Sequence, residues 1–149
     1  MQPIIDHIHI TVENLERAEK FYDSFLPLLG FDLSLKEHDC VDEHDYHIVE
    51  YHSSSSSIGL VNCRTAFKAE KINRRKPGSL HHMAFRVNSP AKVDALYEQI
   101  KALGAPIVHA PQLYPEYCCD YYAFFFKDSE GIEYEIVSFA REQYFPKDL

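Results

Sequence analysis

The stretch from Ile5 to Leu33, "IDHIHITVENLERAEKFYDSFLPLLGFDL", decides the fold because the chain carries it twice. The second copy, "LHHMAFRVNSPAKVDALYEQIKALGAPIV", begins at Leu80 and follows the same plan. His7 matches His82 at a shift of 75 residues, which is half the length of the 149-residue chain. The sequence therefore predicts two copies of one module.

Each copy reads as one strand, one helix and three further strands. Asn14 in the first copy and Asn88-Ser89 in the second follow an alternating strand and suit a helix start. Gly30 and Gly104 then suit the left-handed helix end. Strand-like runs follow at 31–35, 45–51 and 57–63, and again at 106–110, 120–127 and 132–139.

The predicted fold class is α+β, with two βαβββ modules in tandem forming a curved mixed sheet around a central cleft. We expect one domain over residues 1–149, with module 1 at about 1–67, module 2 at about 78–140 and a C-terminal tail at 141–149. A module with one helix and four strands leaves one sheet face uncovered, and two copies can bury or share that face.

Composition excludes several classes of function. The net charge is −8 and the only basic cluster is "NRRK" at 73–76, so we expect no nucleic-acid partner. The N-terminus has no signal-peptide pattern and no apolar run reaches the ~18 residues of a membrane span, so we expect a cytoplasmic protein without a membrane partner. The four cysteines show no C-x-x-C spacing and are expected to be reduced thiols.

Three side chains fall at places that suit metal binding. His7 and His9 share one strand face, but the repeat pairs His7 with His82 and pairs His9 with Ala84. Glu135 lies on the last strand, where a buried carboxylate needs a partner. Two imidazoles and one carboxylate bind a divalent transition metal and leave coordination positions open, so we predict a metal site at His7, His82 and Glu135.

The motifs "DHIHITVENLERAEKFYDSFLPLLGF", "LHHMAFRV" and "DSEGIEYEIV" resemble the vicinal-oxygen-chelate superfamily. Its members include glyoxalase I, methylmalonyl-CoA epimerase, fosfomycin-resistance thiol transferases, extradiol dioxygenases and metal-free bleomycin-binding proteins. The resemblance places the metal ligands on His7, His82 and Glu135. The fourth ligand of glyoxalase I and the epimerase aligns with Gly59, which has no side chain to coordinate, so the chain resembles the three-ligand members.

This resemblance implies a metal-dependent lyase, isomerase or dioxygenase that chelates two neighbouring oxygens of a small organic substrate. It implies one divalent ion, Zn, Ni, Mn, Fe or Co, and a homodimer. An alternative is a metal-free protein that binds or sequesters a small molecule such as an antibiotic, and a third possibility is a regulatory or partner-binding domain.

The general base is not visible in the sequence. His47, Tyr51 and Tyr122 are candidates. His9, Gly59 and Phe125 are candidates for the substrate pocket. Glu133 shares a strand face with Glu135 but lies nearer the turn, so we expect it to be a solvated carboxylate at the rim.

Overall fold

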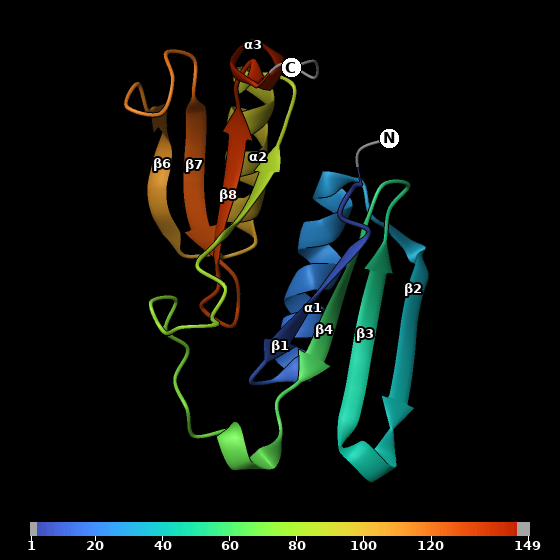
Figure 1. Cartoon of the computed structure of the whole chain (residues 1–149). Helices are drawn as coiled ribbons and strands as arrows, with labels where there is room; N and C mark the ends of the chain where they lie inside the picture. Colours follow the sequence, from blue (N-terminus) through green and yellow to red (C-terminus); the bar gives the residue numbers. More distant parts are fainter. Residues whose placement is uncertain (1–2, 146–149) are drawn as a thin grey trace. The chain divides into compact units, whose positions relative to one another are not determined.

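The computed structural model of the chain describes residues 3–145. It divides into two compact units, residues 1–72 and residues 73–149, and each is described by itself. Each unit contains one four-stranded sheet with a helix along one face (Figure 1). Among the described residues, no helix has the length and apolar character needed to cross a membrane.

The first unit has the strand order β1-β4-β3-β2, in which β1 runs parallel to β4 and the other neighbours are antiparallel. Short 3-10 turns follow α1, β2 and β4. Its main elements are β1 (His7–Val12), α1 (Leu15–Phe25), β2 (Asp32–Val41), β3 (Tyr46–His52) and β4 (Ser57–Asn62).

The second unit has the equivalent order, β5-β8-β7-β6, with β5 parallel to β8. Its elements are β5 (Met83–Arg86), α2 (Pro90–Ala102), β6 (Ile107–Leu113), β7 (Tyr122–Lys127), β8 (Glu133–Ser138) and the short α3 (Arg141–Tyr144). The prediction of an α+β fold with two βαβββ modules is confirmed, and each module has a mixed sheet of its own.

The helix starts form as the sequence indicates. The Asn14 side chain accepts a hydrogen bond from the Arg17 N–H at 2.9 Å, and the Ser89 hydroxyl accepts one from the Lys92 N–H at 3.2 Å. Each bond satisfies one of the free N–H groups in the first turn of a helix. Gly104 follows α2 with a φ of +80°, a conformation that other residues rarely adopt.

Strand β2 is longer than the predicted run at 31–35. It continues to Val41 through the polar segment that we expected to be a loop, and Glu37 pairs with Glu50 of β3. Because β2 is an edge strand whose residues are almost all exposed, it needs no alternation of apolar and polar residues. Periodicity therefore could not reveal its full length.

The core of each unit lies between its sheet and its helix. Side chains of alternate strand positions pack against the helix, while the other sheet face carries the polar residues discussed below. The largest fully buried side chains of the first unit include Tyr22, Phe25, Tyr51 and Leu60, and those of the second include Leu96, Ile100, Phe124, Phe126, Tyr134 and Ile136.

Candidate metal centre and pocket

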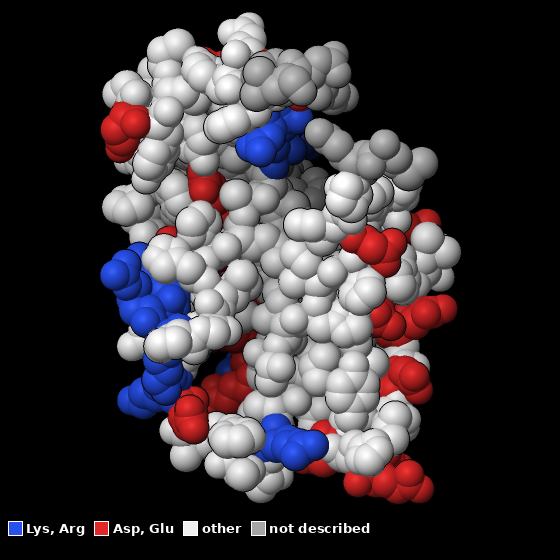
Figure 2. Space-filling model, in the orientation of Figure 1, with Lys and Arg blue, Asp and Glu red and all other residues white. Residues whose placement is uncertain are grey.

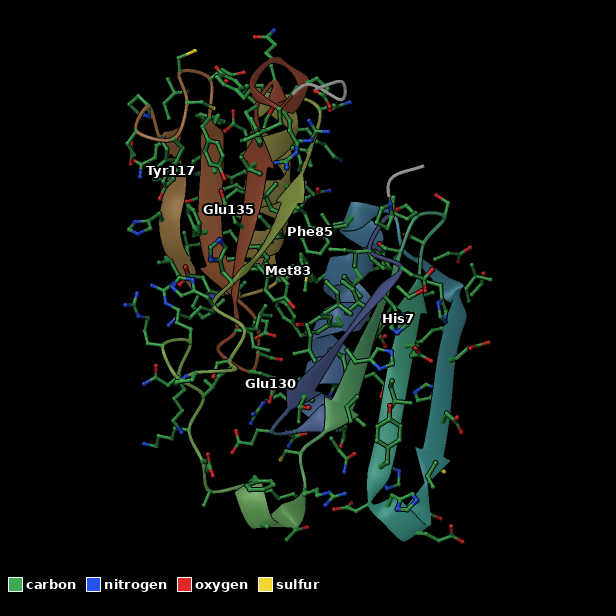
Figure 3. All side chains as sticks on the ribbon, viewed as in Figure 1. His7, Met83, Phe85, Tyr117, Glu130 and Glu135 are labelled. Atoms are coloured by element: carbon green, nitrogen blue, oxygen red, sulfur yellow. The ribbon has the colours of Figure 1, made fainter. Side chains whose placement is uncertain are left out.

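Glu135 is a buried carboxylate in the middle of β8, on the sheet face away from α2 (Figure 3). The Tyr121 hydroxyl donates a hydrogen bond to its Oε1 at 2.6 Å, and its Oε2 lies 3.5 Å from Nε2 of His82. Burial raises the pKa of Glu135, while the Tyr121 hydrogen bond and the nearby His82 oppose that rise. A carboxylate in this setting gains from a bound cation.

His82 directly precedes β5, so it is held at the entrance of that strand. Its Nδ1 lies 2.8 Å from Nδ1 of His81, which leaves Nε2 directed toward Glu135. Its ring centroid lies 6.3 Å from that of Phe125. The structure therefore brings together two of the three predicted ligands and one predicted pocket residue.

A cavity of about 660 Å³ opens beside His82 and Glu135. That volume lies within the range of about 300–1,000 Å³ usual for sites that bind small organic molecules. Most of the lining is aromatic or aliphatic, with charged groups at separate places. The lining residues are His82, Ala84, Arg86, Tyr117, Cys118, Tyr121, Phe125, Glu135, Val137, Phe139, Arg141, Tyr144 and Phe145.

Glu133 differs from its prediction. It is buried and forms an ion pair with Arg74, from the segment before β5. The expectation of a solvated rim carboxylate was wrong because the "NRRK" segment supplies a guanidinium that shields this end of β8. Sequence periodicity places Glu133 on the correct face but says nothing about the segment that covers it.

The first unit carries its own pair of imidazoles on β1. Nδ1 of His7 donates to Oδ2 of Asp6 at 2.9 Å, which leaves Nε2 free to bind a metal (Figure 3). The His9 ring lies next to it, with ring centroids 4.9 Å apart. Nε2 of His9 donates to Oε1 of Glu50 at 3.0 Å, so the Glu50 carboxylate orients the His9 ring.

Gly59 occupies the place in the first unit that Glu135 occupies in the second. Gly59 pairs with His9 across the parallel strands, as Glu135 pairs with Ala84. A Cβ atom at Gly59 would lie 2.6 Å from Cδ2 of His9 and 3.0 Å from Cδ1 of Ile48. The His9 ring therefore fills the space that a fourth ligand's side chain would need.

The candidate bases lie elsewhere. The Tyr51 hydroxyl is buried against α1 and donates to Asp23 at 2.9 Å, and the Tyr122 hydroxyl donates to Asp94 of α2 at 2.8 Å. Both tyrosines face the helices, so the structure removes them from the candidate bases. His47 has the same strand parity as Tyr51, and its Nε2 lies 3.9 Å from Oδ1 of Asp42 in the turn before β3.

Glu50 and Tyr121 were not among the predicted site residues. Strand alternation could have indicated both residues. Glu50 lies opposite Gly59 on the neighbouring strand. Tyr121 has the same strand parity as Phe125, and Phe125 lies opposite Glu135. The hydrogen bonds that give them their roles are visible only in the structure.

The repeated βαβββ fold, with an imidazole and a buried carboxylate on one open sheet face, defines a chain of the vicinal-oxygen-chelate class. The model of the Glyoxalase/Bleomycin resistance protein/Dioxygenase superfamily matches residues 4–136, and the chain belongs to that superfamily. The expected resemblance is thereby confirmed.

Individual relatives agree with this assignment. The uncharacterized protein YqjT of Bacillus subtilis is 27% identical over 142 residues, which cover 89% of this chain and 96% of YqjT. A presumed glyoxalase from Bacillus halodurans is also 27% identical, with a TM-score of 0.72 over 92% of this chain and 96% of the other. The fosfomycin resistance protein FosX of Listeria monocytogenes shares the fold, with 15% identity and a TM-score of 0.64 over 99% of this chain and 100% of FosX.

Proposed function

We propose that the protein is a metal-dependent enzyme of lyase, isomerase or oxygenase type. It acts on a small organic molecule through two neighbouring oxygens, with His82 and Glu135 as ligands to one divalent ion and with His7, from this chain or from a second copy of it, as the third predicted ligand. The observation that carries this proposal is the buried carboxylate of Glu135, which has an imidazole nitrogen 3.5 Å away and an organic-sized cavity beside it.

The residues fit a metal ion. Two ligand atoms that each lie about 2.0–2.2 Å from one ion stand roughly 3–3.6 Å apart, and the 3.5 Å between His82 and Glu135 agrees with this. Each proposed ligand also has an outer partner that fixes its orientation: Asp6 for His7, His81 for His82 and Tyr121 for Glu135. The nitrogen and oxygen donor set suits Zn, Ni, Mn, Fe or Co.

When bound, the ion supplies Lewis-acid stabilisation of negative charge on substrate oxygens. The chain itself supplies a proton acceptor in His9. Because Nε2 of His9 donates to Glu50, Nδ1 of the neutral ring is free to accept a proton, and Glu50 stabilises the imidazolium that forms. His9 is next to His7, so a substrate bound at His7 lies within reach of it.

The apolar lining of the cavity also suits the second function considered, a protein that binds a small molecule without chemistry. The two functions differ in the role of His82 and Glu135, which bind a metal ion in the enzyme and need not do so in the binding protein. Ligand binding that is unchanged in His82→Ala and Glu135→Gln variants would favour the binding protein.

The test is metal analysis of protein purified without a metal-affinity tag. We expect one ion per chain in the wild type and loss of the ion in His7→Ala, His82→Ala and Glu135→Gln. His44→Ala is the control, because His44 is an exposed histidine of the turn after β2. A wild-type protein that holds no metal, even after addition of each of the five ions, contradicts the proposal.

A further inference from the structure

The cavity of the second unit has different charges at its two ends. The cavity is lined by every second residue from His82, which precedes β5, through Ala84 to Arg86. In extended backbone, neighbours on one face stand about 6.5–7 Å apart, so Arg86 lies about 13 Å along the strand from His82. Ala84, opposite Glu135, lies between them. One end of the cavity therefore holds the proposed metal ligands and the other a guanidinium.

A second guanidinium lies at the same end. Arg141, the first residue of α3, lines the cavity, and its Cζ lies 4.7 Å from the Phe145 ring centroid. Asp120 fixes the surrounding segment by accepting hydrogen bonds from the Ala140 N–H at 2.7 Å and the Tyr144 hydroxyl at 2.9 Å. Arg141 is thus held beside the cavity by a tethered helix. Figure 2 shows basic side chains next to α3 on this face.

Among the described lining residues, no acid lies at this end of the cavity. Glu135 is the one carboxylate among the described lining residues, and it belongs to the other end. Arg86 pairs with Glu142 at 2.9 Å, but Glu142 is not part of the lining, and a guanidinium has donors to spare. Within residues 3–145, no carboxylate is in ion-pair contact with Arg141. Two cations at one end of an apolar cavity, in a chain of net charge −8, favour an anionic ligand.

We propose that the substrate is an organic anion that spans this cavity. Its carboxylate or phosphate binds Arg86 and Arg141, and its planar body lies against the aromatic walls. Its two neighbouring oxygens reach His82 and Glu135. The oxygen end of this proposal rests on the proposed function, whereas the anion end depends on the two arginines alone.

The test uses metal-free protein, prepared with a chelator, and measures binding by calorimetry. The probe is 3-(3,4-dihydroxyphenyl)propanoate, and its primary amide is the uncharged match. We expect the acid to bind about tenfold more tightly than the amide, because a charge-assisted contact to a guanidinium is lost in the amide. The corresponding phosphate ester, 2-(3,4-dihydroxyphenyl)ethyl phosphate, shows which anion the arginines prefer.

Variants assign the preference to the cavity. Arg141→Gln and Arg86→Gln should each remove most of the preference for the acid, and binding of the amide should stay unchanged. Arg17→Gln is the control, because Arg17 lies on α1 and pairs with Glu13. A wild-type preference that weakens as salt concentration rises would show that the preference is electrostatic, and the variants assign it to the cavity.

The outcomes separate this proposal from the metal site. Equal binding of acid and amide by the wild type overturns it, as does a preference that persists in both arginine variants. A preference that persists in His82→Ala protein lacking metal supports the anion end even where the metal proposal fails. Loss of metal binding in that variant, with no preference for the acid, supports only the metal site.

Discussion

Substitution of Gly59 by alanine should disturb the first unit through one identified contact. The new Cβ would lie 2.6 Å from Cδ2 of His9, whereas carbon atoms in ordinary contact stand about 3.5–4.0 Å apart. The His9 ring must therefore move by about 1 Å, and its 3.0 Å hydrogen bond to Glu50 cannot survive that shift. The Cδ1 atom of Ile48, 3.0 Å from the new Cβ, limits the space on the other side.

The expected loss of stability follows from these terms. A hydrogen bond to a charged group contributes about 1.5–3 kcal/mol, and exposure of both partners lowers that figure. Gly→Ala in a strand gains roughly 0.5–1 kcal/mol from the lower entropy of the unfolded chain. The difference between these terms leaves an expected fall of about 1 kcal/mol in the free energy of unfolding of Gly59→Ala.

A double-mutant cycle in urea measures the contact directly. In a His9→Ala background the clash with His9 is gone and only the 3.0 Å approach of Ile48 remains, so Gly59→Ala should be neutral within about 0.5 kcal/mol. Turnover, once a substrate is known, should fall to the same level in both single variants. Equal losses of stability from Gly59→Ala in the two backgrounds would refute the assignment of the clash to His9.

Two further predictions concern hydrogen bonds to carboxylates. Tyr121→Phe removes the hydrogen-bond donor that opposes the raised pKa of Glu135, so the pKa of Glu135 should rise further. Because metal binding needs the ionised carboxylate, metal affinity should fall about tenfold, and the loss of metal on acidification should begin at a higher pH. Metal titrations at a series of pH values measure both effects. Lys36→Met should reduce the part of the first unit's stability that is lost on acidification. Burial alone would raise the pKa of Glu19, but hydrogen bonds from Lys36 and His38 outweigh it and lower that pKa below 4.5. The lowered pKa stabilises the folded protein above pH 4.5, and this stability is lost as the pH falls through the folded pKa. Urea unfolding should therefore show a smaller stability difference between neutral and acidic pH in Lys36→Met than in the wild type. A Lys20→Met control that shows the same reduction would argue against the pair.

The fold could be predicted because the signal is repeated. Alternation on β1, the cap at Asn14 and the equivalence of His7 and His82 are local patterns, and finding them twice removes most alternatives. The family resemblance aligned the fourth ligand position with Gly59, and the strand register shows that Gly59 is the equivalent of Glu135. The apolar neighbours Tyr134 and Ile136 indicated a buried strand, and Glu135 is buried within it.

Other parts of the site depend on contacts between distant segments. Arg74 covers Glu133 from 59 residues away, and the sequence gives no sign of that contact. Tyr51 resembles a base because tyrosines can transfer protons, but its strand parity directs it to α1. The guanidinium end of the cavity depends on Arg141, in a segment that we had treated as a tail.

The close fit of Gly59 under the His9 ring has a consequence for the history of the chain. The first copy holds Gly59 where the second copy holds Glu135, and the His9 ring fills the space that a side chain at position 59 would need. A direct change from glycine to glutamate at position 59 is hindered, because the Cβ of any side chain there collides with the His9 ring. Position 9 would have to change first, and that change alone would give up the His9–Glu50 pair. The order of substitutions is thus constrained, because a side chain at position 59 requires a smaller residue at position 9 first.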